Sequence, residues 1–209
     1  MRKGLFISIE GSDGSGKSTQ IKNIKRFFED KGIDIIFTRE PGGTPIGEKL
    51  REIILDRNLK EMSDMTEALL YAAARAQHVS QIIRPALEEG KIVICDRFVD
   101  SSIAYQGYGR GLLEPVTVIN NFAVDGCMPD LTFLMKMDPR VGRRRIKEEQ
   151  QDRIELEQDD FHIRTFEGYL ELQKRYPERI VSIDASRSIE AIKLDIYNKL
   201  EEVLRGVSF

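Results

Sequence analysis

Short apolar runs rich in β-branched residues alternate along the chain with longer stretches whose apolar residues recur at helical spacing. The runs predict strands at residues 5–10, 33–38, 91–96, 131–138 and 179–184. Several of them are almost continuously apolar, as is typical of parallel strands that are covered on both faces. The alternation of strands and helices therefore predicts a doubly wound α/β fold.

Helical spacing is clear after the first run, where Ile21, Ile24, Phe27 and Phe28 recur on one side. Pro85 predicts a bend within the longest helical stretch. No internal repeat or long linker interrupts the pattern, so we expect a single domain over residues 1–209. Further helices are predicted at 45–55, 66–89, 115–124, 139–149, 161–175 and 189–204.

The segment from Gly11 to Ser18 reads Gly-Ser-Asp-Gly-Ser-Gly-Lys-Ser and fits the phosphate-binding loop pattern. It lies between a predicted strand and a predicted helix, which favours this interpretation over an ordinary Gly/Ser-rich turn. Glycines let successive N–H groups face phosphate oxygens, Lys17 can reach the β- and γ-phosphates of ATP, and Ser18 can ligate Mg²⁺. The residues expected to hold the nucleotide are Gly11, Ser12, Asp13, Gly14, Ser15, Gly16, Lys17, Ser18 and Thr19.

Composition narrows the function classes. The 32 basic and 35 acidic residues give a net charge of −3, which lacks the basic excess of a general nucleic-acid binder. Cys95 and Cys127 lie in apolar runs and are expected to be buried thiols in a reducing compartment. No apolar run approaches the ~18 residues of a membrane span, and no signal peptide is evident. We therefore expect a cytoplasmic protein that binds neither nucleic acid nor membrane.

A second anion site is indicated at the predicted strand ends, where ligands bind in open α/β sheets. Arg39 precedes a Pro-Gly-Gly turn and can present its guanidinium to a phosphate, although a solvent-exposed loop arginine is the alternative. Asp96 ends the third strand and suits a Mg²⁺-linked role. Arg97 suits a second anion clamp, and an Asp96–Arg97 ion pair is compatible with both roles. Two arginines near a nucleotide loop imply a second anionic ligand.

The stretch Ser101-Ser-Ile-Ala-Tyr-Gln-Gly107 supplies hydroxyls, a phenol and an amide, which suit the edge and face of a nucleobase. The alternative is a helix N-terminus capped by Asp100 or by the first serine, with Tyr105 in the core. Tyr71 and Arg75 stand four residues apart on a predicted helix and can add a stacking face and a guanidinium.

Residues 140–160 are dense in charge, with basic residues early and a mostly acidic, Gln-rich run later. This pattern is typical of a solvated helix surface, but it also suits a mobile lid that brings arginines over ATP. The pattern alone favours neither interpretation.

Together these motifs resemble those of bacterial thymidylate kinases over roughly residues 4 to 205. The phosphate-binding loop is generic. The stretches that begin at Thr38 and at Asp96 are specific to that family. The remaining matches include Pro129-Asp-Leu-Thr132 and Asp152-Arg-Ile-Glu155. The stretches that carry the resemblance are Gly11–Ser18, Thr38-Arg-Glu-Pro-Gly-Gly-Thr44, Glu67-Ala-Leu-Leu-Tyr-Ala-Ala-Ala-Arg75 and Asp96-Arg-Phe-Val-Asp-Ser-Ser-Ile-Ala-Tyr-Gln-Gly107.

The resemblance implies transfer of the γ-phosphoryl group of ATP to dTMP with Mg²⁺, giving dTDP and ADP, in the synthesis of dTTP for DNA replication. It implies the fold of P-loop nucleoside monophosphate kinases, in which a five-stranded parallel sheet of order 2-3-1-4-5 is covered by helices on both faces. It also implies a homodimer packed through helices, with the 66–89 helix in both the core and the dimer face.

The resemblance further assigns a dTMP site. Arg39 and Arg97 match positions that clamp the dTMP phosphate, and Asp13 matches a loop carboxylate that meets the sugar 3′-hydroxyl. Arg51 matches a helix residue near the acceptor pocket. The full set of matching positions is Asp13, Arg39, Arg51, Tyr71, Arg75, Arg97, Ser102, Tyr105 and Gln106.

The same matches also imply which residues of that site surround the base. Tyr71 matches an aromatic position that stacks on thymine, and Arg75 and Gln106 match residues that hydrogen-bond the base. Tyr105 matches the residue that disfavours a ribose 2′-hydroxyl.

The expected catalytic residues are Lys17, Arg97, Arg145 and Asp13, and the expected Mg²⁺-linked residues are Ser18 and Asp96. Some family members carry an arginine inside the loop, where this chain has Gly14, so the catalytic cation is expected from the lid. Arg145 is the favoured residue. The other candidates are Arg143, Arg144, Lys147 and Arg153.

Two other functions stay open on the residues alone. A deoxynucleoside kinase of the same fold would take an acceptor without a phosphate and would need a general base, whereas the Arg39 and Arg97 pair favours a phosphorylated acceptor. A phosphate-loop switch that uses ATP conformationally would not need the acceptor-site residues at all.

Overall fold

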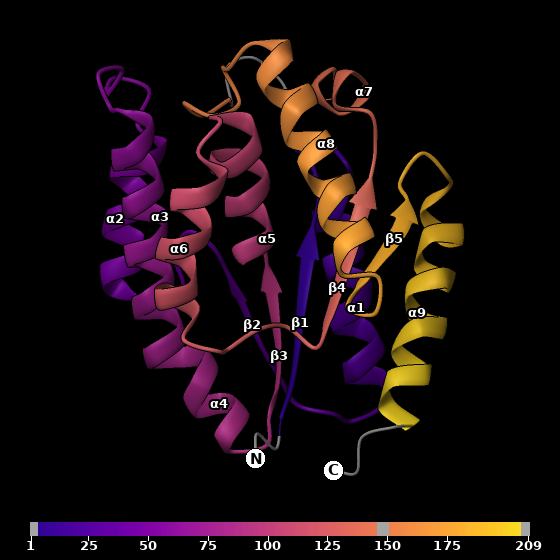
Figure 1. The fold of residues 1–209 in the computed structure, drawn as a ribbon. Coiled ribbons are helices and arrows are strands. Elements are labelled where there is room, and N and C mark those ends of the chain that lie inside the picture. The colour runs from indigo at the N-terminus through magenta and orange to yellow at the C-terminus, as the bar shows by residue number, and fades with distance from the viewer. Residues whose placement is uncertain (1–3, 146–150, 206–209) are drawn as a thin grey trace.

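The computed structural model describes residues 4–145 and 151–205. Five parallel strands form one sheet of order β2-β3-β1-β4-β5 (Figure 1), which confirms the predicted fold class and order. Each strand begins and ends within two residues of its predicted limits. The strands are β1 (Leu5–Glu10), β2 (Ile35–Arg39), β3 (Ile92–Asp96), β4 (Leu131–Lys136) and β5 (Ile180–Asp184).

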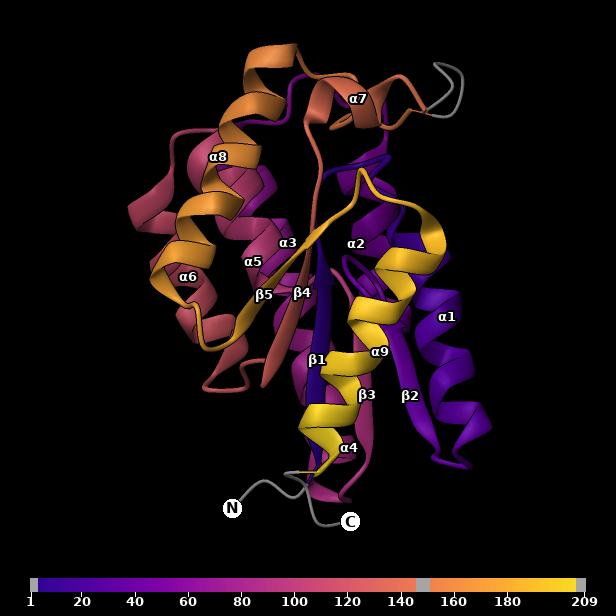
Figure 2. The ribbon, with the colours of Figure 1, turned by 90° about the vertical axis from the view of Figure 1, so that its right-hand side faces the viewer.

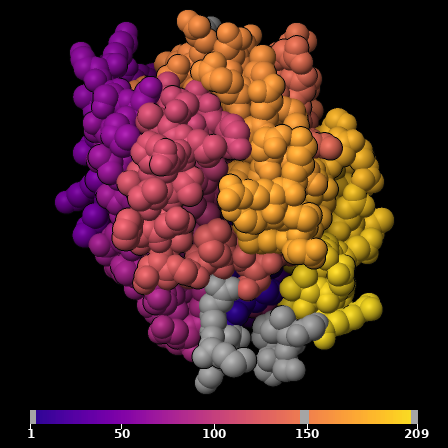
Figure 3. All heavy atoms as spheres, viewed as in Figure 1, coloured from indigo at the N-terminus to yellow at the C-terminus, as the bar shows by residue number. Residues whose placement is uncertain are grey.

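Helices cover both faces of the sheet, which explains the nearly continuous apolar strands. Ile7, Ile94 and Phe133 pack against α1 (Lys17–Asp30) and α9 (Ile189–Arg205) on one face, and residues one position along, such as Phe6 and Val93, pack on the other. Figure 2 shows these two layers. The remaining helices are α2 (Pro45–Leu55), α3 (Asp64–His78), α4 (Arg84–Glu88), α5 (Val99–Ser102), α6 (Leu113–Val124), α7 (Pro139–Arg143) and α8 (Asp159–Arg175). In Figure 3, α6 and α8 meet over the sheet and hide its strands.

The predicted helix over residues 66–89 is interrupted. Between α3 and α4 the backbone takes a wider π-helical turn, Val79–Ile83. Pro85 has no N–H and cannot bond the carbonyl of Gln81, so the wider turn just before the proline accommodates the lost hydrogen bond. A second π-helical segment, Ile103–Gly109, continues α5, so the cluster after β3 is helical and Tyr105 is buried.

The predicted helix over residues 139–149 is described only as far as Arg143 in α7, since residues 146–150 lie outside the described part of the chain. Because the strands are parallel, the loop after β1 and the residues ending β2 and β3 gather at the same edge of the sheet (Figure 1). Within residues 4–145 and 151–205, no helix combines the length and apolarity needed to cross a membrane.

Candidate active site

The loop after β1 adopts a compact turn at the start of α1. Gly14 and Gly16 have φ angles of 73° and 88°, a left-handed conformation that favours glycine. Lys17 folds back so that Nζ donates to the carbonyls of Gly11 at 2.8 Å and Ser12 at 2.9 Å. Burial, followed by the nearby Arg97 guanidinium, lowers the pKa of Lys17 to about 8. The loop therefore closes around its own lysine.

Helix α7 packs directly on this loop. A Cβ atom placed on Gly14 would lie 2.1 Å from the Gly142 carbonyl oxygen, and one on Gly142 would lie 2.4 Å from the Asp13 carbonyl oxygen. Neither position can carry a side chain in this arrangement, so an arginine at position 14 is incompatible with it. Arg145 instead donates from Nη1 to the Gly14 carbonyl at 3.2 Å, which brings a cation of the predicted lid segment to the loop.

Arg97 connects the loop to the end of β3. Its backbone is left-handed, with a φ angle of 66°, and its N–H bonds the Ile9 carbonyl at 3.0 Å. Its guanidinium donates to the Gly11 carbonyl at 2.9 Å and forms an ion pair with Asp13. Burial alone would raise the pKa of Asp13, but Arg97 and Lys17 hold that pKa well below its usual range. Arg97 is thus paired with Asp13, which lies far from it in sequence, rather than with the adjacent Asp96.

Glu10 holds the turn that carries Arg97. Its buried carboxylate accepts from the Phe98 N–H at 2.7 Å and from Ser101 Oγ at 2.5 Å, and Tyr169 Oη donates to it at 3.1 Å. Burial, and then the charge of Asp100, raises the pKa of Glu10 to about 7. The sequence reasoning missed this residue. Its signal was a carboxylate that ends a buried strand directly before the loop.

One cavity of about 450 Å³ joins the loop to the predicted acceptor residues. All nine residues assigned to the dTMP site by resemblance line it, together with Ser18 and Asp96. Arg145 is not among the lining residues. The lining residues that sequence reasoning did not assign to the site are Glu40, Pro41, Leu55, Ser101, Asp152, Ile154 and Glu155.

Two guanidiniums lie at the β2 end of this cavity. Arg39 pairs with Glu48 at 2.8 Å, and Arg51 donates to the Pro41 carbonyl at 3.0 Å. Burial, followed by the charge of Arg39, lowers the pKa of Arg51. Two neighbouring cations create a site that favours an anion.

Arg75 is the most heavily bonded side chain of the acceptor side, and it is 1% exposed. Glu40 accepts from Nε at 2.7 Å and pairs with Nη2, which also donates to the Phe98 carbonyl at 3.1 Å. Nη1 donates to Ser102 Oγ at 2.9 Å and to Asn120. All five N–H groups are thus engaged by protein acceptors, and Arg75 presents its guanidinium at the cavity wall in a fixed orientation.

The remaining lid candidates are placed differently from Arg145. Arg143 pairs with Asp159 at 2.5 Å, Arg144 is exposed, and Lys147 lies outside the described residues. Arg153 pairs with the buried Glu67 at 2.8 Å and donates from Nε to the Ile54 carbonyl at 2.9 Å. The segment around Arg153 therefore packs on α2 and α3 on the acceptor side.

Asp152 and Glu155, on either side of that arginine, line the cavity. Burial raises the pKa of each of these carboxyls. The Asp152 carboxylate accepts from the N–H groups of Ile154 and Glu155, both at 2.9 Å, and the Ile154 side chain is buried. These contacts give the end of the charged segment a fixed place beside Asp13 and Arg97, so the segment is not one continuous solvated helix.

A phosphate-binding loop on a five-stranded sheet of order 2-3-1-4-5, joined by one cavity to a second set of cations, defines the class of P-loop nucleoside monophosphate kinases. The family model for thymidylate kinase matches residues 9–196. A thymidylate kinase of Symbiobacterium thermophilum is 51% identical over 96% of this chain and 94% of its own length, and one of Clostridium novyi is 47% identical over 92% and 96%.

The crystal structure of thymidylate kinase from Ehrlichia chaffeensis superposes with a TM-score of 0.77 at 33% identity, covering 95% of this chain and 98% of that one. The chain therefore belongs to the thymidylate kinase family, whose reaction is the phosphorylation of dTMP to dTDP.

Proposed function

We propose that this chain carries out that reaction with MgATP as donor, using the cavity between the loop and the β2 and β3 ends as the place where both substrates meet. The observation that carries the proposal is the Arg97–Asp13 pair, because it links the loop carboxylate to the arginine that faces the acceptor side. The pair would hold the residues that bind ATP and those that bind dTMP in a fixed relative position. An in-line phosphoryl transfer requires this.

The donor half of the site is built from the loop. The buried hydroxyls of Ser12 and Ser15 have no hydrogen-bond partner among the described residues, so they remain available to an anion in the loop. Lys17 would exchange its bonds to backbone carbonyls for the β- and γ-phosphates of ATP, whose negative charge favours the ammonium form. Thr19 follows Ser18 at the exposed start of α1.

The residues present fit a Mg²⁺ ion bound with the nucleotide. Asp96 Oδ1 is buried and has no hydrogen-bond partner in the part of the chain that the structure describes, and Ser18 and Asp96 both line the cavity. Among the described residues, no group of three His, Cys, Asp or Glu side chains is arranged to hold a metal. This suits Mg²⁺, which keeps several waters and takes ligands from substrate phosphates. Ser18 and, through water, Asp96 would hold the ion, which neutralises phosphate charge when bound.

No general base is needed on the acceptor. The second pKa of a phosphate monoester is about 6, so dTMP is largely a dianion at neutral pH. The obstacle is repulsion between two polyanions, and Arg39, Arg51 and Arg97 offset it on the acceptor side. Arg145 is the lid cation whose contact with the loop best supports a role at the transferred group.

A coupled assay that offers ATP with dTMP, dUMP, thymidine or no acceptor tests the proposal. We expect rapid ADP release with dTMP, slower release with dUMP, and little with thymidine or without acceptor. Preference for thymidine would indicate a nucleoside kinase. Turnover that does not depend on the acceptor would contradict the kinase reaction.

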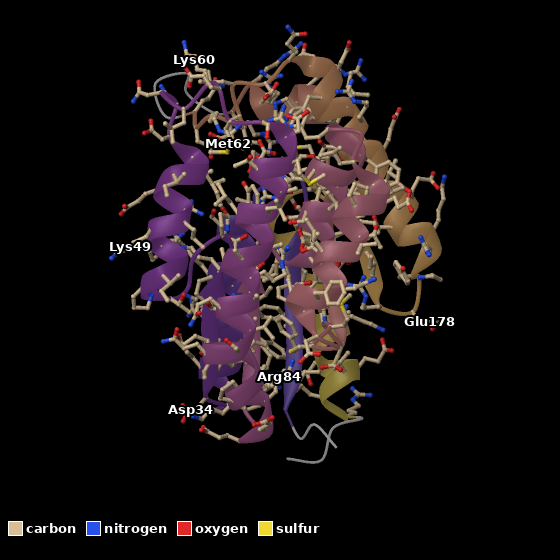
Figure 4. All side chains as sticks on the ribbon, turned by 60° about the vertical axis from the view of Figure 1, so that its left-hand side comes forward. Asp34, Lys49, Lys60, Met62, Arg84 and Glu178 are labelled. Atoms are coloured by element: carbon tan, nitrogen blue, oxygen red, sulfur yellow. The ribbon has the colours of Figure 1, made fainter. Side chains whose placement is uncertain are left out.

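We also propose that the chain works as a cytoplasmic homodimer. Helices α2, α3 and α6 pack side by side and expose a group of large apolar side chains. Figure 4 views the molecule with this side turned forward, and Lys49 of α2 points away from the body there. Within residues 4–145, the thiols of Cys95 and Cys127 are buried and form no disulfide, which suits a reducing compartment. The exposed apolar side chains on these three helices are Ile46, Ile53, Met65, Leu69, Leu113, Val118 and Phe122.

A further inference from the structure

The amide of Gln106 is held in one orientation at the cavity wall. Gln106 lies in the π-helical segment after α5, lines the cavity and is 1% exposed. Its Nε2 donates to Glu67 Oε1 at 2.9 Å. A carboxylate can only accept hydrogen bonds, so it can meet only the NH₂ end of the amide. Gln106 Oε1 has no hydrogen-bond partner among the described residues, so the acceptor end of the amide remains available.

Two arginines hold the Glu67 carboxylate in place and balance its charge. It is fully buried on α3, where it pairs with Arg110 at 2.9 Å and with Arg153 at 2.8 Å. Arg110 also pairs with Glu157 at 2.6 Å. Two guanidiniums around one buried carboxylate offset the cost of burying its charge. Turning the Gln106 amide over would point its carbonyl oxygen at the Glu67 carboxylate, so that two acceptors would face each other.

The other base-side residue, Arg75, has all of its N–H groups engaged by protein acceptors. Gln106 Oε1 is thus an unengaged acceptor beside a guanidinium whose donors already have protein acceptors. A nucleobase edge that donates at the facing position would satisfy this oxygen. An edge with a lone pair at that position would leave two acceptors facing each other, which costs affinity.

We propose that Glu67 is a positioning residue that turns the Gln106 carbonyl toward the base, and so selects pyrimidine monophosphates with an N–H at ring position 3 over those with a lone pair there. Thymine and uracil carry that N–H, whereas neutral cytosine does not. The inference rests on the proposed function, since it assigns the acceptor specificity of the same site. It predicts discrimination against dCMP without any effect on the choice between dTMP and dUMP.

The test compares kcat/KM for dTMP, dUMP and dCMP in Glu67→Gln and the wild type. A neutral amide at position 67 can donate as well as accept, so the Gln106 amide is free to turn and present its NH₂ end. We expect the dTMP-to-dCMP ratio of kcat/KM to fall about tenfold or more, the size of one well-placed hydrogen bond. The dTMP-to-dUMP ratio should stay unchanged.

Asp64→Asn is the matched control. Asp64 pairs with the same Arg110 at 3.3 Å and is half exposed, and among the described residues no hydrogen bond or ion pair joins it to Gln106. This variant should keep both ratios at wild-type values. If Glu67→Gln raises KM for every acceptor equally and leaves the dTMP-to-dCMP ratio unchanged, Glu67 is only structural and the inference is overturned.

A charge-conserving exchange, Glu67→Gln with Gln106→Glu, covers the case in which the single variant does not fold. It keeps one carboxylate and one amide in the pair, but the carboxylate now faces the base and can only accept. We expect it to retain the preference for dTMP over dCMP, measured both as kcat/KM and as Kd by calorimetry. Loss of that preference in a folded exchange variant would contradict the inference. A wild type that binds dTMP in preference to dCMP without phosphorylating it would instead overturn the proposed function alone.

Discussion

Two residues at the junction of β1 and β3 set the geometry of the site. Arg97 occupies a left-handed backbone conformation that a side-chain-bearing residue seldom adopts. The buried Glu10 carboxylate stabilises that turn by accepting the Phe98 N–H. The guanidinium thereby reaches the loop at Gly11 and Asp13. Local strain at Arg97 is thus maintained by contacts that start from another strand.

Glu10 makes stability depend on pH. Its pKa is raised from 4.5 to about 7 in the folded protein, chiefly by burial and then by Asp100. Between these values the folded state binds the proton more tightly than the unfolded state, so the Glu10 contribution falls as pH rises from about 5 to about 8. The isosteric Glu10→Gln variant has no proton to lose. Its free energy of unfolding should therefore rise relative to the wild type over this range, by on the order of 1–3 kcal/mol.

Urea unfolding of both proteins at pH 5.5, 6.5 and 8 measures this difference. Taking the variant minus the wild type removes the other titrating groups from the comparison. A difference that stays constant across the three pH values would contradict the raised pKa of Glu10.

Arg145 is the lid residue expected to act on the transferred phosphoryl group. We expect Arg145→Ala to lower kcat by roughly 10³-fold, as for other arginines that stabilise this transition state. KM for dTMP should change little, because Arg145 does not line the acceptor cavity. Arg140→Ala is the control, since Arg140 is exposed and pairs only locally with Asp138 at 2.8 Å. Near-normal kcat in Arg145→Ala would move the role to Arg144 or Lys147.

At the scale of elements, α7 packs directly on the phosphate-binding loop. This packing depends on two glycines, Gly14 and Gly142, each of which lies too near the other segment to carry a Cβ atom. This contact gives a short helix of low intrinsic stability a defined place over the loop. The absence of a side chain at position 14 therefore permits the packing of α7 that brings Arg145 close.

Gly142→Ala tests this contact. Its Cβ would lie 2.4 Å from the Asp13 carbonyl oxygen, so α7 has to shift away from the loop. A displacement of about 1 Å can cost roughly 10²-fold in rate, and we expect kcat to fall by about that factor. The thermal unfolding midpoint should change little because alanine suits a helix. Val141→Ala, at an exposed neighbouring position, should leave kcat near that of the wild type, and equal kcat values in the two variants would argue against the contact.

At the scale of the whole molecule, seven of the thirteen large apolar side chains exposed among the described residues lie on α2, α3 and α6. Phe122 is 80% exposed, and Leu69 and Val118 are about half exposed. Exposed apolar side chains on neighbouring helices support the proposed interface, because monomeric proteins seldom expose large apolar patches. A second copy of the chain related by a two-fold axis would cover the same residues on both partners.

Phe122→Glu should convert the proposed dimer to a monomer. A carboxylate brought into an apolar two-fold interface meets its own copy, and both charges lose their hydration. Multi-angle light scattering should give about twice the chain mass of 24.0 kDa for the wild type and that of one chain for the variant. Arg84→Glu, at an exposed arginine that pairs with Asp125, is the control for added negative charge and should leave the mass unchanged. A monomeric wild type would contradict the proposed dimer.

The sequence by itself was sufficient for the strands and most helices, which depend on local periodicity. The family resemblance added nine of the residues that line the cavity, but seven other lining residues were missed. The sequence was not sufficient for the π-helical turn before Pro85 or for the division of roles among the basic residues of the charged segment, since those depend on what packs against them.

Only the tertiary structure showed that Arg97 pairs with Asp13 rather than with Asp96, and that Glu67 orients Gln106. The partners in these pairs lie far apart along the chain. Local periodicity therefore does not indicate which distant charge or amide will lie within hydrogen-bond distance of a given side chain. A buried polar group must find a partner wherever the packed elements supply one. Local sequence therefore determined which chemical groups the site contains, and the packing of distant segments determined which of their atoms face the substrates.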